Sequence, residues 1–308
     1  MDGKIAGVSV TIGPDKAKKL EARAKEMLEL AWISRKALKE YAGLCSWVSS
    51  IVRSMRPYCR MIWAAATSHP AGRESWDKVA GPRVRWALRW IIAAVQLQLG
   101  TFSRTFPLVP PSEVCVITFD ASLTGGGATL HMQEDASGKP VAYLHGTWSD
   151  QDENELGANR VNPKFQAHWE AYMLLRAVSA WNEVLKQPFK LTLRGDALGV
   201  LQGVVAGRAR NPGVNLVIAE MQLRLTATAH DLSAVHWWSE HNKVCDDLSR
   251  MTDSDQPPRE VAGARCDEMS RPQEWQFLGR PGIADPDAWG DCPAKVLQES
   301  ESAEECPV

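Results

Sequence analysis

At 308 residues, 44% of them hydrophobic, the chain is long enough to bury one or two cores, which excludes a wholly disordered protein. Its seven cysteines form an odd set without C-x-x-C spacing, so neither a disulfide framework nor a zinc site is predicted. The start lacks a signal peptide's apolar segment, and the most apolar later run, "WALRWIIAAVQLQLG", is too short to span a bilayer and contains Arg89. We therefore expect an intracellular protein, cytoplasmic or nuclear, without membrane association.

Charge is distributed unevenly along the chain, although the net charge is only -2. Residues 1–105 hold 18 Lys and Arg against 8 Asp and Glu, whereas residues 251–308 hold 5 against 13. A basic first third is typical either of a solvated helical surface or of a surface that binds an anionic polymer. Composition leaves both readings open.

The first third of the chain is predicted to be helical. In "PDKAKKLEARAKEMLELAW", a proline stands at the helix start and apolar residues follow at helical spacing. A second stripe runs through "SRKALKEYAGLCSWVSSIVRSMRPYCRMIWAAA", where Ser34 is a candidate N-cap and Pro57 is expected to break or kink the helix. A third helix is expected near residues 83–99, before the linker "PLVPP". We expect residues 1–105 to form a small all-helical region.

From residue 113 the hydrophobic period becomes that of strands. The segments "EVCVITFD", "GGGATLHM" and "PVAYLHGTW" predict three antiparallel strands, with the three glycines assigned to a tight hairpin turn. A long helix "NPKFQAHWEAYMLLRAVSAWNEVLK" follows, then a strand "KLTLRGD", a short helix "ALGVLQGVVAG" and a helix near residues 213–229. The strand "LSAVHWW" and the helix "NKVCDDLSRM" come last. This order predicts an α/β domain over residues 113–252, with a mixed five-stranded sheet and flanking helices.

The last part of the chain, residues 253–308, is acidic and rich in proline. Such a composition buries too little apolar area to offset its ordering entropy. We expect a mostly disordered acidic tail, with residues 275–278 as the candidate docking segment.

Four carboxylates stand where this domain could bring them together. Asp120 and Asp196 each end a predicted strand, Glu170 lies on the apolar face of the long helix, and Asp246 lies in the first turn of the last helix. Taken singly, each carboxylate has an ordinary explanation: a turn residue, a helix cap, a residue at the edge of a helix face, or a partner of the helix dipole. Clustered carboxylates instead require cations, and magnesium is the ion that prefers such oxygen ligands. Spacing alone leaves Asp247 as an alternative to Asp246.

These segments resemble the ribonuclease H family. "TFDAS" is similar to its first-strand motif, "HWEAYMLLRAV" to its Glu-bearing helix, "RGDALGVLQGV" to its second-Asp strand, and "NKVCDDLSR" to its closing signature. The closing signature assigns the fourth position to Asp246. "SRKALKEYAGLCSWVSSIVRSMRPYCRMIWAA" resembles the thumb and connection helices of retroelement reverse transcriptases, while the Tyr-x-Asp-Asp polymerase motif is absent. The resemblance implies a reverse-transcriptase fragment without its polymerase palm, so polymerase modules would come from another chain.

The resemblance implies an endonuclease that hydrolyses the RNA strand of RNA/DNA hybrids. Two Mg2+ ions, with Mn2+ as a substitute, would be held by the four family carboxylates, namely Asp120, Glu170, Asp196 and Asp246. The hybrid's phosphates would be tracked by basic residues of the helical region, namely Lys36, Lys39, Arg53, Arg56 and Arg60.

The sequence also departs from the family pattern. Ala197 follows the second Asp where many relatives have a polar residue, His241 is no clear match to the family histidine, and "SDQDENELGANRVNPK" is an acidic link whose charge would oppose a phosphate. The alternative is a catalytically inactive, retroelement-derived protein that binds nucleic acid. A transposase or integrase nuclease ranks last, because it needs an Asp, Asp, Glu order.

Overall fold

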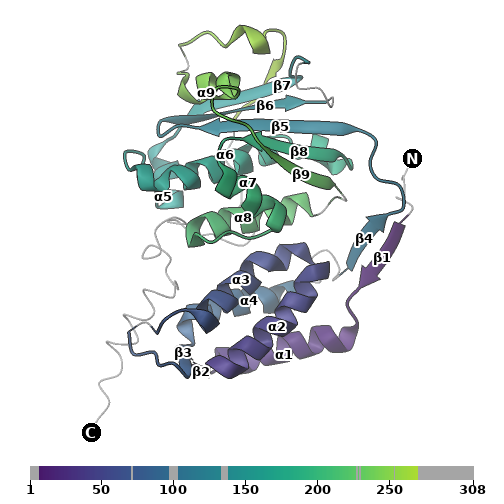
Figure 1. Ribbon diagram of the computed structural model, residues 1–308, viewed down its shortest axis with the longest axis vertical. Coiled ribbons are helices and arrows are strands. Elements are labelled where there is room, and N and C mark those ends of the chain that lie inside the picture. The colour runs from purple at the N-terminus through teal and green to yellow at the C-terminus, as the bar shows by residue number, and fades with distance from the viewer. Residues whose placement is uncertain are drawn as a thin grey trace. The chain divides into compact units, whose positions relative to one another are not determined.

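The computed structural model describes residues 7–70, 72–96, 103–132, 138–226, 228, 230–252 and 254–269 (Figure 1). The chain divides into two compact units, which we call the helical unit (mainly residues 9–105) and the sheet unit (mainly residues 106–269). Within the described ranges, no helix combines the length and the apolar character needed to cross a membrane. The proposed docking segment at residues 275–278 lies outside the described residues.

Helices form the core of the helical unit. The break expected at Pro57 is confirmed: one helix ends at Ile51, a 3-10 turn follows over Arg53–Met55, and Pro57 lies in the first turn of the next helix, where a missing N–H is tolerated. Leu20, Leu38 and Ile62 are fully buried between the helices. The helices are α1 (Pro14–Leu28), α2 (Arg35–Ile51), α3 (Arg56–Thr67) and α4 (Pro82–Gln96).

The prediction of an all-helical region is wrong, because short strands are present as well. Strand β2 (Trp32–Ser34) pairs antiparallel with β3 (Lys78–Ala80), and β1 (Gly7–Thr11) pairs with β4 (Ser103–Pro107). Ser34 precedes α2 as predicted but makes no capping hydrogen bond with its side chain, since it belongs to β2. Strands of three to five residues are too short to leave a recognisable period in the sequence.

A buried ion network holds the β2–β3 ribbon to the helices. The Glu74 carboxylate accepts hydrogen bonds from the Arg83 guanidinium at 2.7 Å and from the Ala80 N–H at 3.0 Å, and it pairs with Arg35 at 3.4 Å. Arg35 also donates to the backbone carbonyls of Ala65 and Ser75. Removing one partner would leave a buried charge uncompensated, so the network ties this part of the unit together.

The sheet unit is a mixed α/β structure built on a six-stranded sheet in the order β10-β7-β6-β5-β8-β9. Three neighbouring strands, β5, β6 and β7, are antiparallel as predicted, and β8 and β9 run parallel to β5. The strands are β5 (Val114–Ala121), β6 (Gly125–His131), β7 (Ala142–Thr147), β8 (Lys190–Gly195), β9 (Asp231–His236) and β10 (Arg265–Cys266).

The sixth strand corrects two predictions, a five-stranded sheet and disorder beginning at residue 253. Strand β10 pairs parallel with β7, and the Trp181 indole N–H donates to Asp267 at 2.9 Å. Before it, a 3-10 turn over Arg259–Val261 places the Val261 side chain in a small core with Leu248. Within the described part of the tail, these contacts supply the burial that its composition did not predict.

Helices cover both faces of the sheet (Figure 1). Helix α9 packs on one face over β5, β6 and β7, and α6 packs on the other face against β5 and β6. The long helix predicted over residues 162–186 is shorter than expected, because 3-10 turns flank α6 at Pro163–Phe165 and Val184–Lys186. The helices are α5 (Asp150–Leu156), α6 (Gln166–Ala180), α7 (Leu198–Ala206), α8 (Pro212–Leu225) and α9 (Lys243–Arg250).

The three glycines 125–127 lie within strand β6, not in the hairpin turn. A Cβ on Gly127 would lie 2.4 Å from the Cβ of Leu248 in α9, and a Cβ on Gly126 would lie 2.2 Å from the Sδ of Met173 in α6. Glycine is therefore required here by close packing of helices on both faces of the strand.

The acidic link before α6 folds as helix α5 and is not an extended repulsive segment. Its N-terminus carries a reciprocal capping box between Ser149 and Asp152. The buried Asp152 carboxylate also accepts from the Tyr172 hydroxyl at 3.0 Å and pairs with Arg176 at 2.9 Å. Arg160 pairs with two further acidic side chains of this helix, so much of the negative charge is neutralised within the fold.

Candidate metal centre

Three chain segments converge at one edge of the sheet. Asp120 is the penultimate residue of β5, and Asp196 directly follows β8. Because β5 and β8 are parallel neighbours, their carboxyl ends meet at the same edge. Glu170 reaches this edge from α6, which packs on β5. From the sequence pattern alone, Asp120 and Asp196 were predicted at strand ends and Glu170 on the apolar face of a helix, and the structure places them there.

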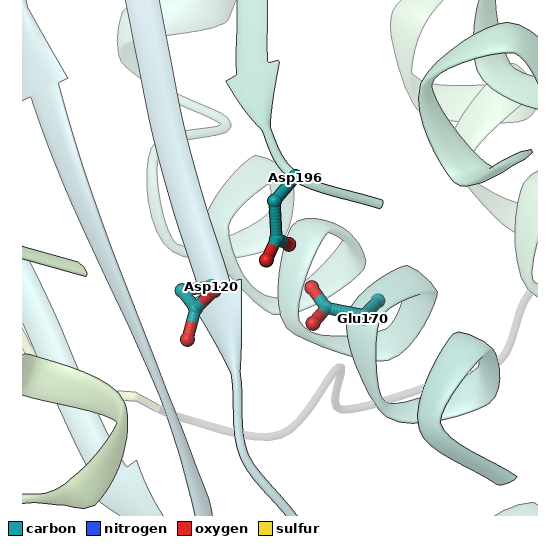
Figure 2. A group of neighbouring side chains, drawn as sticks. All are labelled: Asp120, Glu170 and Asp196. Atoms are coloured by element: carbon teal, nitrogen blue, oxygen red, sulfur yellow. The ribbon is translucent and has the colours of Figure 1, made fainter. Parts of the chain in front are cut away.

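The three carboxylates form a compact cluster. One oxygen from each of Asp120, Glu170 and Asp196 lies within 4.8 Å of the others. Figure 2 shows the Asp196 and Glu170 carboxylates pointing toward one another across the end of the strands. Asp120 is 5% exposed and Glu170 4%, while Asp196 is half-buried, so the cluster opens to solvent on the Asp196 side.

Two side chains of the last helix region hold Asp120. The Ser249 hydroxyl donates to Asp120 Oδ2 at 3.0 Å, and the Asn242 amide donates to Oδ1 at 3.4 Å and to the Phe119 carbonyl at 3.0 Å. Burial is the main cause that raises the pKa of Asp120 to about 6, with the negative charge of Asp196 next. The Ser249 hydrogen bond acts in the opposite direction and lowers this pKa.

Glu170 is the most deeply buried member of the cluster. Its Oε1 accepts from the Gln166 amide at 3.0 Å, but its buried Oε2 has no hydrogen-bond partner among the described residues. Burial, followed by the charges of Asp120 and Asp196, raises the pKa of Glu170 well above its usual range. A buried carboxylate oxygen without a donor is rare in folded proteins, and a bound cation would satisfy it.

Asp196 is oriented from the loop that follows β9. The Ser239 hydroxyl donates to Asp196 Oδ2 at 2.8 Å, and His236 Nε2 hydrogen-bonds the Asp196 backbone carbonyl at 3.0 Å.

Asp246 does not join the three-carboxylate cluster. Its half-buried carboxylate pairs with Arg250, one turn later on α9, at 2.6 Å. It still lies close enough to raise the pKa of Asp120 by its negative charge. Asp247, the alternative that spacing left open, is exposed on the same helix.

Basic residues predicted to contact nucleic acid lie in the helical unit with different exposures. Lys36 and Lys39 are exposed on α2, whereas Arg53, Arg56 and Arg60 are half-buried. Arg56 donates to the Ser49 carbonyl at 3.2 Å, so part of its hydrogen-bonding capacity is used within the unit.

Sequence reasoning missed the polar side chains that orient the carboxylates. Asn242 and Ser249 stand seven residues apart across α9, a spacing of two helical turns that puts both on the face packed against the sheet. Both are almost fully buried. The presence of two small polar residues on the buried face was the sequence signal from which their role could have been predicted. Ser239 and Gln166 left no comparable pattern.

Comparisons with known proteins give little support of their own. No family model matches the chain, and no curated protein matches it. A foamy viral protease-reverse transcriptase in complex with RNA/DNA hybrid is similar at 12% identity and a TM-score of 0.29, covering 78% of this chain and 29% of that one. The same type of viral protein in complex with dsDNA gives 11% identity, a TM-score of 0.28, and 72% and 41% coverage.

Scores this low do not establish a shared fold, so these likenesses carry no argument about the chain. The chain also spans well under half the length of the viral proteins. The functional case therefore depends on the site itself and on the sequence motifs.

Proposed function

We propose that the sheet unit is a ribonuclease H-like, metal-dependent endonuclease that hydrolyses the RNA strand of RNA/DNA hybrids. The observation that carries the proposal is the convergence of Asp120, Glu170 and Asp196, with the buried Glu170 Oε2 lacking a donor within the described part of the chain. The family motif order of the sequence supports the same reading. Under this proposal, residues 113–252 are the ribonuclease H-like domain, and residues 1–105 correspond to thumb and connection helices.

The chemistry of the cluster suits a hard divalent cation. Carboxylate oxygens are the ligands that Mg2+ prefers, and Mn2+ can take the same ligands. Asp120, Glu170 and Asp196 would hold the metal, and Asp246 is the proposed fourth ligand from the closing signature. A bound pair of such ions supplies an activated water and stabilises the departing oxygen of a phosphodiester.

The chain's own residues orient this cluster. Ser249 and Asn242 fix the rotamer of Asp120, and Gln166 fixes Glu170. Since the two inner carboxylates are buried and Asp196 is half-buried, a phosphate would approach from the Asp196 side. Discrimination of RNA would come from contacts to its 2'-hydroxyl groups across the minor groove.

The test is cleavage of a labelled RNA/DNA hybrid by the full chain in Mg2+. We expect cuts in the RNA strand only, and no cuts in EDTA. Asp196→Asn should reduce the cleavage rate by more than about 100-fold, which exceeds the loss typical when a residue that only supports a metal ligand is changed. Asp247→Asn is the matched control, because this exposed carboxylate lies outside the cluster. Equal background from the wild type and Asp196→Asn would contradict the nuclease proposal.

One observation favours a second candidate, a retroelement-derived protein that binds nucleic acid without cutting it. The Asp246 carboxylate is engaged by Arg250, so only three of the four family carboxylates are gathered. If this candidate is right, the hybrid binds with a steep salt dependence and stays intact in Mg2+ and in Mn2+.

A further inference from the structure

An exposed tryptophan stands beside the carboxylate cluster. Trp238, in the loop between β9 and α9, is 65% exposed, although tryptophan is among the side chains that gain most from burial. Its neighbour Trp237 is half-buried, and the Arg194 guanidinium lies over its ring at 4.5 Å. Packing within the described structure thus accounts for Trp237, while most of the Trp238 indole faces solvent.

The backbone at Trp238 is fixed by the residues that hold the carboxylates. Its carbonyl accepts from the N–H of His241 at 2.8 Å and from the N–H of Asn242 at 3.1 Å. The Asn242 side chain in turn donates to Asp120. The next residue, Ser239, donates to Asp196. Hydrogen bonds on both sides of Trp238 therefore place it in a defined position relative to the cluster.

The indole ring is held as well. The His236 imidazole lies edge-to-face with it at a centroid distance of 4.6 Å, and His236 Nε2 hydrogen-bonds the Asp196 carbonyl. A ring that is supported in this way and still exposed is pre-organised to receive a second flat group.

We propose that Trp238 is a positioning residue on which a base or sugar of the nucleic-acid strand stacks while its phosphate lies at the carboxylates. This inference rests on the proposed function and names a substrate contact for it. Cations held by the cluster would engage only the phosphate, so an uncharged contact next to it would hold the base or sugar of the same nucleotide. An indole face does so for any base, because every base presents a π-face.

The experiment measures binding of a fluorescently labelled RNA/DNA hybrid to the full chain by anisotropy, with Ca2+ in place of Mg2+. We expect Trp238→Ala to weaken binding by about 5- to 100-fold, the range for loss of one stacked base, and Trp238→Phe to recover most of the affinity. Trp76→Ala is the matched control: Trp76 is 68% exposed and lies edge-to-face with His69. In Mg2+, Trp238→Ala should raise KM more than it lowers kcat.

The outcomes separate this inference from the nuclease proposal. Binding by the wild type without cleavage, together with weaker binding by Trp238→Ala, would support the stacking contact and contradict only the nuclease. Equal affinities for Trp238→Ala and Trp76→Ala would overturn the stacking contact, even if cleavage occurs. A changed oligomeric state with unchanged affinity would instead assign Trp238 to a protein interface, and no binding by the wild type would overturn both proposals.

Discussion

The carboxylates of Asp120 and Glu170 are buried where no described ion pair neutralises their negative charge. Their pKa values are raised chiefly by burial, and no described cationic side chain makes a direct ion pair with either of them. Ser249, Asn242 and Gln166 only partly replace the lost hydration. The metal-free fold is therefore destabilised when these carboxylates ionise, and a bound cation would remove that penalty.

The first prediction follows from Asp120, whose pKa is raised from 3.8 to about 6 in the fold. The folded state binds this proton more tightly, so the stabilisation is complete below about pH 4 and is lost as the pH rises through about 6. In EDTA, the free energy of unfolding of the wild type should fall between pH 4 and pH 7 by up to about 3 kcal/mol more than that of Asp120→Asn. Urea unfolding at both pH values measures this difference.

The control for that comparison is Asp247→Asn, which removes an exposed carboxylate and should follow the wild type. Identical pH dependence of the wild type and Asp120→Asn would show that the raised pKa is wrong.

Among the elements, α9 is placed by the backbone of β6. The strand has no side chain at Gly127, so Leu248 and the Ser249 N–H come close to the sheet, and Ser249 then reaches Asp120. The position of a strand glycine thus decides whether the carboxylate receives its hydrogen bond. If the glycines had formed a hairpin turn, they would not have set the distance between α9 and the sheet.

The second prediction concerns this close approach. Gly127→Ala should destabilise the protein by about 1–3 kcal/mol or more, because the new Cβ meets main-chain and Cβ atoms of α9 that cannot move aside cheaply. Gly199→Ala is the control: no atom lies within 4 Å of its added Cβ, and alanine in a helix should stabilise by about 0.5–1 kcal/mol. Denaturant unfolding compares them, and equal stabilities would contradict the packing argument.

For the whole molecule, opposite charges are concentrated in different parts of the chain. The carboxylate cluster belongs to the sheet unit, whereas residues 1–105 carry the excess of Lys and Arg. We therefore expect the charge-dependent part of the proposed polyanion binding to depend on the helical unit and the proposed cleavage chemistry to depend on the sheet unit. Lys36 and Lys39, both exposed on α2, are the best placed of the basic residues predicted to bind phosphates.

The third prediction separates these two roles. Changing Lys36 and Lys39 to Glu should weaken hybrid binding and reduce the slope of log affinity against log salt by about 0.7–0.9 for each phosphate that is no longer neutralised. Lys186→Glu is the control, since Lys186 is exposed in the sheet unit and pairs with Glu183. A salt titration with the labelled hybrid measures both slopes, and an unchanged slope in the double variant would exclude this surface from binding.

The sequence could predict those parts of the fold and the site that leave a local period or end signal. Strands β5 to β9 and helices α6, α7 and α8 follow from apolar runs and their spacing, and Asp120 and Asp196 are visible as acids at strand ends. Strand β10, by contrast, has two residues and forms only because β7 offers an open edge. Helix α5 was not predicted because its seven residues are too few to show a helical period, although its Ser149–Asp152 capping box is a local signal.

By itself, then, the amino-acid order determined which carboxylates can meet, since the period of a strand and of a helix is a property of neighbouring residues. Only the tertiary structure decided the rest: that Asp246 stays outside the cluster, that Asn242 and Ser249 hold Asp120, and that glycines admit α9 to the sheet. Most of these features depend on distances between segments more than 100 residues apart along the chain, and no local pattern encodes such distances.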